Sequence, residues 1–293
     1  MKKYNPIQSV GLIGNPDQAV KHGFVRKIEN LIAGSGRKVL LDQTIASTPR
    51  TKGIVFPDSI ELARASDLLV VIGGDGTVLR VARETAGSNT PLLGINAGRL
   101  GFLTSASIDN IAEPLENLWA NKYIVDPLPL IEATGMSAGN YIKTLALNDI
   151  LVSRGANPRL IELAVKVDGE PLTTYRCDGL IVATPAGSTA YSLSAGGAVV
   201  TPRAEVLTLS PICPQALSNR PLIVSFASTI EVTLLKHRAE SYLSADGQVM
   251  GELLENDTIQ IRRSRKKAKL VRLEGNSFFE TLRHKLNWTG SHA

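Results

Sequence analysis

The first third of the chain alternates short apolar runs with segments whose apolar residues recur at helical spacing. The runs predict strands at residues 9–13, 38–41, 68–72 and 91–96, and the helical spacing predicts helices at residues 19–34, 59–65, 78–86 and 108–121. Residues 44–58 are polar and contain two prolines, which predicts a loop. Strands alternating with helices predict a Rossmann-like α/β domain whose ligand crevice lies at the carboxyl ends of parallel strands.

From about residue 125 the pattern changes to strands separated by tight turns. Strands are predicted at residues 145–152, 160–167, 180–183, 222–225, 230–235, 258–262 and 268–273. Asp168-Gly169 and Asp246-Gly247 predict turns between some of these strands. A mostly β, sandwich-like domain is therefore predicted for this part of the chain.

The length of 293 residues and the hydrophobic content of 43% are enough for one large domain or two ordinary ones. We predict an α/β domain at residues 1–124, a mostly β domain at residues 125–273 and a tail at residues 274–293. The tail places Phe278, Leu282 and Leu286 at four-residue spacing, which predicts a helix that docks on another surface.

The composition favours a cytoplasmic protein with an anionic ligand. The net charge is +5, a mild basic excess that suits such a ligand and does not require nucleic acid. The two cysteines lack CxxC spacing and the four histidines form no ligand spacing, so neither a disulfide framework nor a protein metal site is predicted. No apolar run approaches the roughly 20 residues that would cross a bilayer, and no secretory signal is predicted.

The first candidate site is the glycine corner at residues 73–77, which reads GGDGT between a predicted strand and a predicted helix. Gly73, Gly74 and Gly76 would let the backbone approach a phosphate, which the first helical N–H groups would face. A carboxylate repels phosphate, so Asp75 is expected to handle a proton or a metal ion instead. On these residues alone, a tight Asp-Gly turn explains the pattern equally well.

The second candidate site is a strand that runs into residues 184–197, a segment dense in hydroxyl groups and small residues. Hydroxyls and bare backbone suit ribose and phosphate, and Tyr191 could face a base. Asn148-Asp149 adds an amide that can read adenine and a carboxylate that can accept from ribose hydroxyls, although by itself the pair is better explained by a β-bulge or a strand-start turn. Asp246-Gly247-Gln248 by itself indicates a hairpin turn, and the basic run at residues 262–269 indicates a solvated hairpin tip.

Several familiar motifs are absent from the sequence. No GxxxxGK[ST] occurs, which excludes a P-loop, and the glycine corner lacks the GxGxxG spacing of a dinucleotide fingerprint. Neither GxSxG nor HExxH is present. An ordinary hydride-transfer Rossmann enzyme is therefore not supported.

Taken together, these blocks resemble the NAD kinase family along nearly the whole chain. The family motifs correspond to GGDG at residues 73–76, GINAGRLGFLT at residues 94–104, Asn148-Asp149, and CDGLIVATPAGSTAYSLSAGG at residues 177–197. Asp246-Gly247-Gln248 and the tail residues 279–288 also match. Two departures are Ala186, where the family usually has threonine, and Gln215, where it usually has histidine.

The resemblance implies phosphoryl transfer from ATP, with a divalent metal such as Mg²⁺, to the 2′-hydroxyl of the adenosine ribose of NAD, which gives NADP. Asp75 would accept the hydroxyl proton, and Gly73, Gly74 and Gly76 would leave room for phosphates. The residues implied to hold NAD are Asn148, Asp149, Thr189, Ala190, Tyr191, Ser192 and Ser194, with Asp178 and Gln248 at the nicotinamide half or its ribose. Arg159 and Arg176 are the cations implied near phosphates, and an arginine at position 176 tends to accompany ATP use.

The resemblance also implies a homodimer or homotetramer with a composite site, and a C-terminal tail that returns to the N-terminal domain. A lipid kinase with the same GGDG corner is an alternative that residues 184–197 argue against. A non-enzymatic nucleotide- or RNA-binding module that uses the basic run is a second alternative, for which no aromatic residues are interleaved. We expect neither a membrane nor a nucleic acid as partner.

Overall fold

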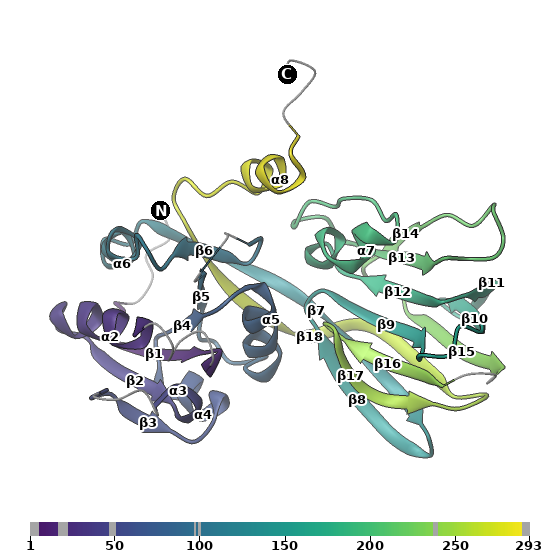
Figure 1. Cartoon of the computed structure of the whole chain (residues 1–293), viewed down its shortest axis with the longest axis horizontal. Coiled ribbons are helices and arrows are strands. Elements are labelled where there is room, and N and C mark those ends of the chain that lie inside the picture. Colours follow the sequence, from purple (N-terminus) through teal and green to yellow (C-terminus); the bar gives the residue numbers. More distant parts are fainter. Residues whose placement is uncertain are drawn as a thin grey trace. The chain divides into compact units, whose positions relative to one another are not determined.

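The computed structural model describes residues 6–16, 23–46, 51–96, 98, 101–236 and 240–288. The chain divides into two compact units, one formed by Met1–Pro127 with Ala268–Ala293 and the other by Leu128–Lys267. Two long strands, β7 (Tyr123–Ser137) and β18 (Thr258–Leu273), carry the chain out of the first unit and back into it (Figure 1). The C-terminal segment thus returns to the N-terminal unit, which confirms that part of the predicted fold.

The N-terminal unit is built on a parallel sheet. Its strands are β1 (Ser9–Gly14), β2 (Lys38–Asp42), β3 (Ile54–Phe56), β4 (Leu68–Ile72), β5 (Leu92–Asn96) and β6 (Thr104–Ser107). Its described helices are α2 (Phe24–Gly34), α3 (Gln43–Ala46), α4 (Ser59–Ala65), α5 (Asp75–Glu84), α6 (Ala112–Trp119) and α8 (Phe278–Leu286). The strand order is β3-β2-β1-β4-β5. The chain runs from β1 outward through β2 to β3 and then returns to β4 on the other side of β1, which is the topology of a doubly wound Rossmann-like sheet.

Helices cover both faces of this sheet. On one face, Ile28 of α2 and Leu115 of α6 share an apolar cluster with Leu12 and Val70 of the central strands. On the other face α4 packs so close to β1 that a Cβ at Gly11 would lie 3.0 Å from the side chain of Leu62. Central strands buried on both faces explain why their sequences read as continuous apolar runs.

Three predictions in this unit are wrong, one of them the helix at residues 108–121, which the structure confines to Ala112–Trp119. Residues 44–58 are not all loop, because the chain forms the end of α3 and then β3, which pairs in parallel with β2. Strand β3 lies at the sheet edge, and its Ile54 and Val55 are 63% and 53% exposed, so its apolar residues do not mark a core. Helix α5 begins at Asp75, three residues before the predicted start, because the glycines before it adopt the turn that opens the helix.

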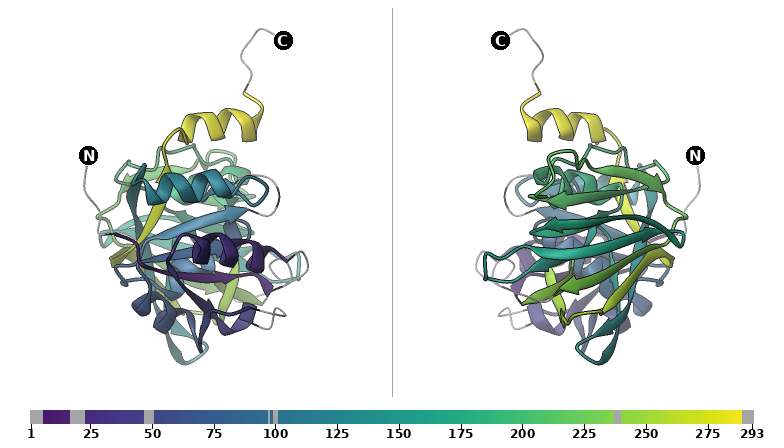
Figure 2. Two further views of the ribbon diagram at one scale, coloured as in Figure 1. Left: turned by 90° about the vertical axis from the view of Figure 1, so that its left-hand side faces the viewer. Right: turned by 90° about the vertical axis from the view of Figure 1, so that its right-hand side faces the viewer.

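The second unit is a sandwich of antiparallel strands (Figure 2). One sheet has the order β14-β13-β12-β9-β16-β17, and the other brings β11, β10, β15 and β18 together, with β7 and β8 beside them. The remaining bounds are β8 (Asn140–Ala146), β9 (Asp149–Arg154), β10 (Ile161–Val167), β11 (Glu170–Cys177), β12 (Gly179–Ala183), β13 (Val206–Ile212), β14 (Leu222–Ser225), β15 (Ile230–Lys236), β16 (Ser241–Ala245), β17 (Gln248–Leu253), a 3₁₀ turn η1 (Ala186–Thr189) and α7 (Tyr191–Ser194). Val152 and Leu180 of the first sheet share one core cluster with Leu163 and Val232 of the second.

The predicted strand at residues 145–152 is in fact two strands in different sheets. Strand β8 ends at Ala146 and pairs with β7, whereas β9 begins at Asp149 and pairs with β12. Leu147 and Asn148 therefore form the corner at which the chain passes from one sheet of the sandwich to the other. The apolar pattern continues through the corner, so the sequence alone does not reveal it.

The predicted hairpin tip at residues 262–269 is also wrong, because this basic run lies inside the single strand β18. Three of its cations have acidic or polar partners on other segments. Arg262 donates to Glu132 at 3.1 Å, Arg263 to Glu205 at 3.4 Å and Lys269 to Asn89 at 3.0 Å. These contacts make the run part of the sheet surface rather than a free basic arm.

The predicted tail helix is confirmed as α8, which packs within the N-terminal unit. The rings of Phe278 and Phe102 lie 6.1 Å apart, and the Asn276 amide donates to the Ser105 carbonyl at 2.8 Å. Leu282, the middle residue of the predicted apolar stripe, is buried. Among the described helices, none has the length and apolar content that crossing a membrane would need.

Candidate functional site

The glycine corner joins strand β4 to helix α5. The helix begins at Asp75 with Gly74 as its N-cap residue. Gly73 has a φ of +153°, a conformation that favours glycine, and a Cβ there would lie 2.8 Å from the Cβ of Thr77. The Gly73 N–H donates to the Ile95 carbonyl at 2.9 Å, which fixes the corner to the end of β5. Asp75 therefore stands at the carboxyl edge of the parallel sheet, where ligands bind in such folds.

The second glycine run binds the carboxylate of Asp75 directly. The Phe102 N–H donates to Asp75 Oδ2 at 2.8 Å, and the Leu103 N–H donates to Asp75 Oδ1 at 3.1 Å. A Cβ at Gly101 would collide with the same carboxylate, so the glycine there is required by the aspartate. Ala97, Arg99 and Leu100 of this run lie outside the described residues. Because both oxygens are oriented by backbone donors, Asp75 points in one direction and retains free lone pairs for a ligand.

In the second unit, Asn148 and Asp149 lie at the corner between the two sheets. The Thr184 N–H donates to the Asn148 carbonyl at 2.8 Å, and a Cβ at Gly187 would collide with that carbonyl. The hydroxyl-rich segment thus packs directly on the corner, so the structure brings these two predicted groups together. The Asn148 side-chain oxygen is buried and has no hydrogen-bond partner among the described residues.

Asp246 holds the same corner from the other side, a contact that sequence reasoning missed. Its carboxylate accepts backbone N–H bonds from Leu147 at 3.0 Å, Asn148 at 2.7 Å and Asp149 at 3.2 Å. Asp246 and Gly247 have φ of +47° and +77° and join β16 to β17, so the predicted hairpin turn is confirmed. The Asp-Gly signal indicates the turn correctly, but no local pattern indicates a partner almost 100 residues away.

Asp149 is a buried carboxyl group beside a second carboxylate. Burial, and after it the negative charge of Asp246, together raise the pKa of Asp149 to about 7. Its side chain is only 6% exposed. Asp149 therefore changes its charge near neutral pH, and a hydroxyl donor placed against it would favour the ionised form.

The hydroxyl-rich segment contains both structural and accessible residues. Ser192 is fully buried and its hydroxyl lies 3.0 Å from that of Ser210, so this side chain supports α7 from within. Thr189 and Ala190 are half-buried, whereas Tyr191 and Ser194 are exposed. The accessible members of the predicted set are therefore Thr189, Ala190, Tyr191 and Ser194.

The structure places Asp178, Arg159 and Arg176 away from this corner and Gln248 beside it. Asp178 precedes β12, and its carboxylate accepts from Arg154 Nε. Asn148 and Thr184 lie at the opposite end of that strand, about 20 Å away at a strand rise of about 3.3 Å per residue. Arg159 and Arg176 are exposed near the Asp178 end. Gln248 is exposed at the start of β17, next to the turn that holds the corner.

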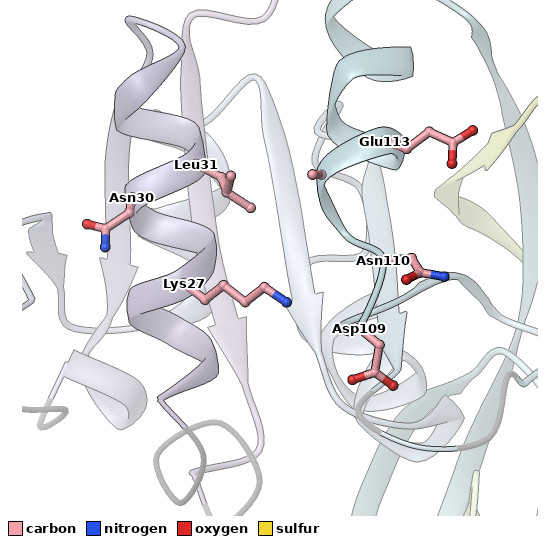
Figure 3. A pocket seen from close by; sticks show the side chains of 7 residues that line it. Lys27, Asn30, Leu31, Asp109, Asn110 and Glu113 are labelled. Atoms are coloured by element: carbon pink, nitrogen blue, oxygen red, sulfur yellow. The ribbon is translucent and has the colours of Figure 1, made fainter.

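A polar groove elsewhere in the N-terminal unit contains none of the predicted residues. It has a volume of about 800 Å³ and is lined by Lys27, Asn30 and Leu31 on α2, by Asp109 and Asn110 just before α6, and by Ala112 and Glu113 in its first turn (Figure 3). The Lys27 ammonium donates to the Ile108 carbonyl at 2.9 Å, so its charge is already engaged with this segment. The chemistry of the glycine corner therefore does not coincide with this groove.

Models of a known family match both halves of the chain. Residues 10–123 match the ATP-NAD kinase N-terminal domain, and residues 147–273 match the ATP-NAD kinase C-terminal domain. The chain belongs to the ATP-NAD kinase family. With both halves matched to this family, the lipid-kinase and RNA-binding alternatives have no support.

Members of the ATP-NAD kinase family resemble this chain over almost its whole length. An NAD kinase of Thiobacillus denitrificans is 38% identical over 287 residues, which cover 97% of this chain and 98% of the relative. An NAD kinase of Syntrophotalea carbinolica is 41% identical over 267 residues, which cover 90% and 92%. A yeast NADH kinase solved with NADH superposes with a TM-score of 0.85 at 28% identity, covering 99% of this chain and 90% of that one. An NAD kinase from Archaeoglobus fulgidus solved with ATP has a TM-score of 0.75 at 31% identity, covering 96% and 100%.

Proposed function

We propose that this chain phosphorylates NAD: the 2′-hydroxyl of the adenosine ribose attacks the γ-phosphorus of ATP, ADP leaves, and NADP is formed. The observation that carries the proposal is the fixed carboxylate of Asp75 at the start of α5, held by two backbone N–H groups. Phosphoryl transfer requires positioning and charge neutralisation more than covalent help from the protein. Asp75 supplies the one proton acceptor that the attacking hydroxyl needs.

The phosphates are proposed to lie over Gly74 and Gly76 at the amino end of α5. A Cβ at either glycine would meet no described atom within 4 Å, so the backbone there faces open space. The first N–H groups of the helix and the positive end of its dipole favour an anion in that space. Gly73 serves the turn itself, since its backbone conformation favours glycine.

Gly76→Ala is expected to weaken ATP binding without loss of folding. The new methyl group would meet no described atom, and alanine is a better helix former than glycine by about 1 kcal/mol, so stability should be kept or raised. The methyl would occupy the space proposed for phosphate, and we expect the KM for ATP to rise by about tenfold or more, since about 1.4 kcal/mol of lost contact is tenfold. Steady-state kinetics with ATP as the varied substrate measures this.

Gly34→Ala is the matched control, because Gly34 also lies in a helix and a Cβ there meets no described atom within 4 Å. It should leave both KM values unchanged. An unchanged KM for ATP in Gly76→Ala would show that the phosphates of ATP do not bind over Gly76.

The adenosine half of NAD is proposed to bind at the corner of Asn148 and Asp149. The Asn148 amide suits the edge of adenine, and the Asp149 carboxylate suits ribose hydroxyls. Thr189, Ala190, Tyr191 and Ser194 would line the same pocket, with the Tyr191 ring available to a base. The buried Ser192 would act by supporting α7.

Asp178, Gln248, Arg159 and Arg176 are proposed to serve the nicotinamide half and the phosphates. Asp178 lies a strand length from the corner within its own chain, which supports a composite site in which a neighbouring subunit supplies it. We therefore propose a homodimer or homotetramer, which sedimentation at several protein concentrations tests. We propose ATP rather than polyphosphate as the phosphoryl donor because the chain has an arginine at position 176.

A divalent cation, with Mg²⁺ as our choice, is proposed to accompany the triphosphate. No three described His, Cys, Asp or Glu side chains gather into a group that could hold a metal ion. The oxygens of Asp75 keep lone pairs beyond their two backbone bonds, and one carboxylate suits Mg²⁺, which takes its other ligands from phosphates and water. Bound there, the ion would neutralise charge on the transferred phosphoryl group. The two free thiols, Cys177 and Cys213, agree with the reducing cytoplasm as the proposed location.

A coupled assay for NADP tests the function directly. The folded protein is incubated with NAD, Mg²⁺ and one of ATP, GTP or polyphosphate, and NADP is detected with a dehydrogenase specific for it. We expect NADP from ATP. Absence of NADP with every donor would refute the assignment, and NADP from polyphosphate alone would refute the choice of ATP.

A further inference from the structure

Asp246 makes more contacts than its hairpin turn requires. The turn needs a residue that tolerates a positive φ, and aspartate, asparagine and glycine all do. The Asp246 carboxylate nevertheless reaches out of the turn to three consecutive backbone N–H groups at Leu147, Asn148 and Asp149. The Asp246 N–H in turn donates to the Asp149 carbonyl at 3.0 Å, so the two residues are joined in both directions.

These contacts set the geometry of the corner. Leu147 and Asn148 lie between β8 and β9 and have no strand partner to orient them. On one side the Asn148 carbonyl is held by Thr184, and on the other the three N–H groups are held by Asp246. The directions of the Asn148 amide and the Asp149 carboxylate follow from this backbone.

The aspartate also carries an energetic cost that a turn residue need not have. Its negative charge opposes ionisation of the buried Asp149 beside it. Asparagine would give the same turn without that repulsion. A neutral residue would, however, lose an acceptor, because an amide has one oxygen in place of two.

We propose that Asp246 is a positioning residue for NAD, which acts through the backbone of residues 147–149 to hold Asn148 and Asp149 in the orientation that binds the adenosine half. This inference rests on the proposed function. It assigns Asp246 a selective effect on one substrate, because the backbone that it holds carries residues proposed to bind NAD, whereas the phosphates of ATP are proposed to bind at the glycine corner.

The test is Asp246→Asn, which keeps the turn but places an amide NH₂ group against at least one of the three N–H donors. Asp168→Asn is a matched control within the same chain. Asp168-Gly169 is a second Asp-Gly hairpin turn with φ of +53° and +85°, and its carboxylate accepts the Thr229 N–H at 2.8 Å. It contacts none of the residues proposed to bind NAD.

For Asp246→Asn we expect the KM for NAD to rise roughly 10- to 100-fold, the loss expected for a hydrogen bond to a charged group. The KM for ATP should stay within about twofold, and the dissociation constant for NAD should rise in parallel by calorimetry. Backbone amides of residues 147–149 should exchange hydrogen faster by mass spectrometry. Asp168→Asn should change none of these values and should accelerate exchange near Thr229.

An unchanged KM for NAD, or equal changes in both KM values, would overturn the inference. Should Asp246→Asn fail to fold, Asp246→Gly replaces it, because glycine also accepts the turn conformation, with Asp168→Gly as its control. A wild-type protein that neither binds NAD nor forms NADP would instead refute the proposed function, whereas the exchange measurement still reports on the contacts of Asp246.

Discussion

Asp75→Asn is expected to lower kcat by about 10²- to 10⁴-fold, the contribution typical of a positioned general base. Asparagine has nearly the shape of aspartate but cannot accept the ribose hydroxyl proton. The loss should fall on kcat and not on the binding of NAD, because the residues proposed to bind NAD are not changed. Stopped-flow single-turnover kinetics, with calorimetric binding of NAD alongside, measures the two quantities separately.

The substitution also has a structural cost that must be separated from the chemistry. Asp75 accepts N–H bonds from Phe102 and Leu103, and the amide can accept only one of them, which costs about 1–3 kcal/mol of stability. Asp58→Asn is the matched control, because Asp58 caps α4 and accepts from Ile60 and Glu61 at 2.8 Å each. Asparagine is a good N-cap, so this variant should keep full activity. If Asp75→Asn turned over NAD at nearly the wild-type rate, Asp75 could not be the general base.

Asp149→Asn is expected to remove a pH dependence of stability worth up to about 4 kcal/mol. The pKa of Asp149 is raised to about 7 by burial and by the charge of Asp246, against about 3.9 in the unfolded chain. Between these values the folded state binds a proton that the unfolded state does not. The free energy of unfolding therefore falls as pH rises from about 4 to about 7, by about 1.36 kcal/mol for each pKa unit.

Urea denaturation at a series of pH values measures the effect. The wild-type and Asp149→Asn curves should diverge in favour of the variant as pH rises through this window, because asparagine carries no charge to bury. Asp168→Asn should instead be less stable than the wild type above the acid range. The Thr229 N–H lowers the pKa of Asp168, so the ionised carboxylate stabilises the folded state there. Parallel curves for wild type and Asp149→Asn would mean that Asp149 is not buried in its ionised form at neutral pH.

Hydrophobic patterning predicts most of the N-terminal unit correctly because its core strands are buried on both faces. The predicted strand at residues 68–72 and the helix at residues 59–65 agree with β4 and α4 to the residue. The pattern fails at β3, whose Ile54 and Val55 are exposed at the sheet edge, where pairing with β2 rather than burial decides the structure. Local composition cannot report that pairing.

In the second unit, two of the failures share one cause. A strand that leaves one sheet and enters another keeps its apolar alternation, so β8 and β9 look continuous in the sequence. The basic run inside β18 looks like a hairpin tip because its charges suggest solvent, although Glu132 and Glu205 neutralise Arg262 and Arg263 along the sheet surface. In each case the deciding partner lies far away in the chain.

The sequence by itself determined the family, the two fold classes, the glycine corner at Asp75 and the residue types proposed for NAD, because backbone conformation and chemical identity are local properties. Only the tertiary structure decided how those groups are oriented. Phe102 and Leu103 fix the carboxylate of Asp75, and Asp246 fixes the corner that carries Asn148 and Asp149. In both places, backbone N–H groups donate to a carboxylate that is distant in the sequence. The geometry of such hydrogen bonds exists only once the strands have paired.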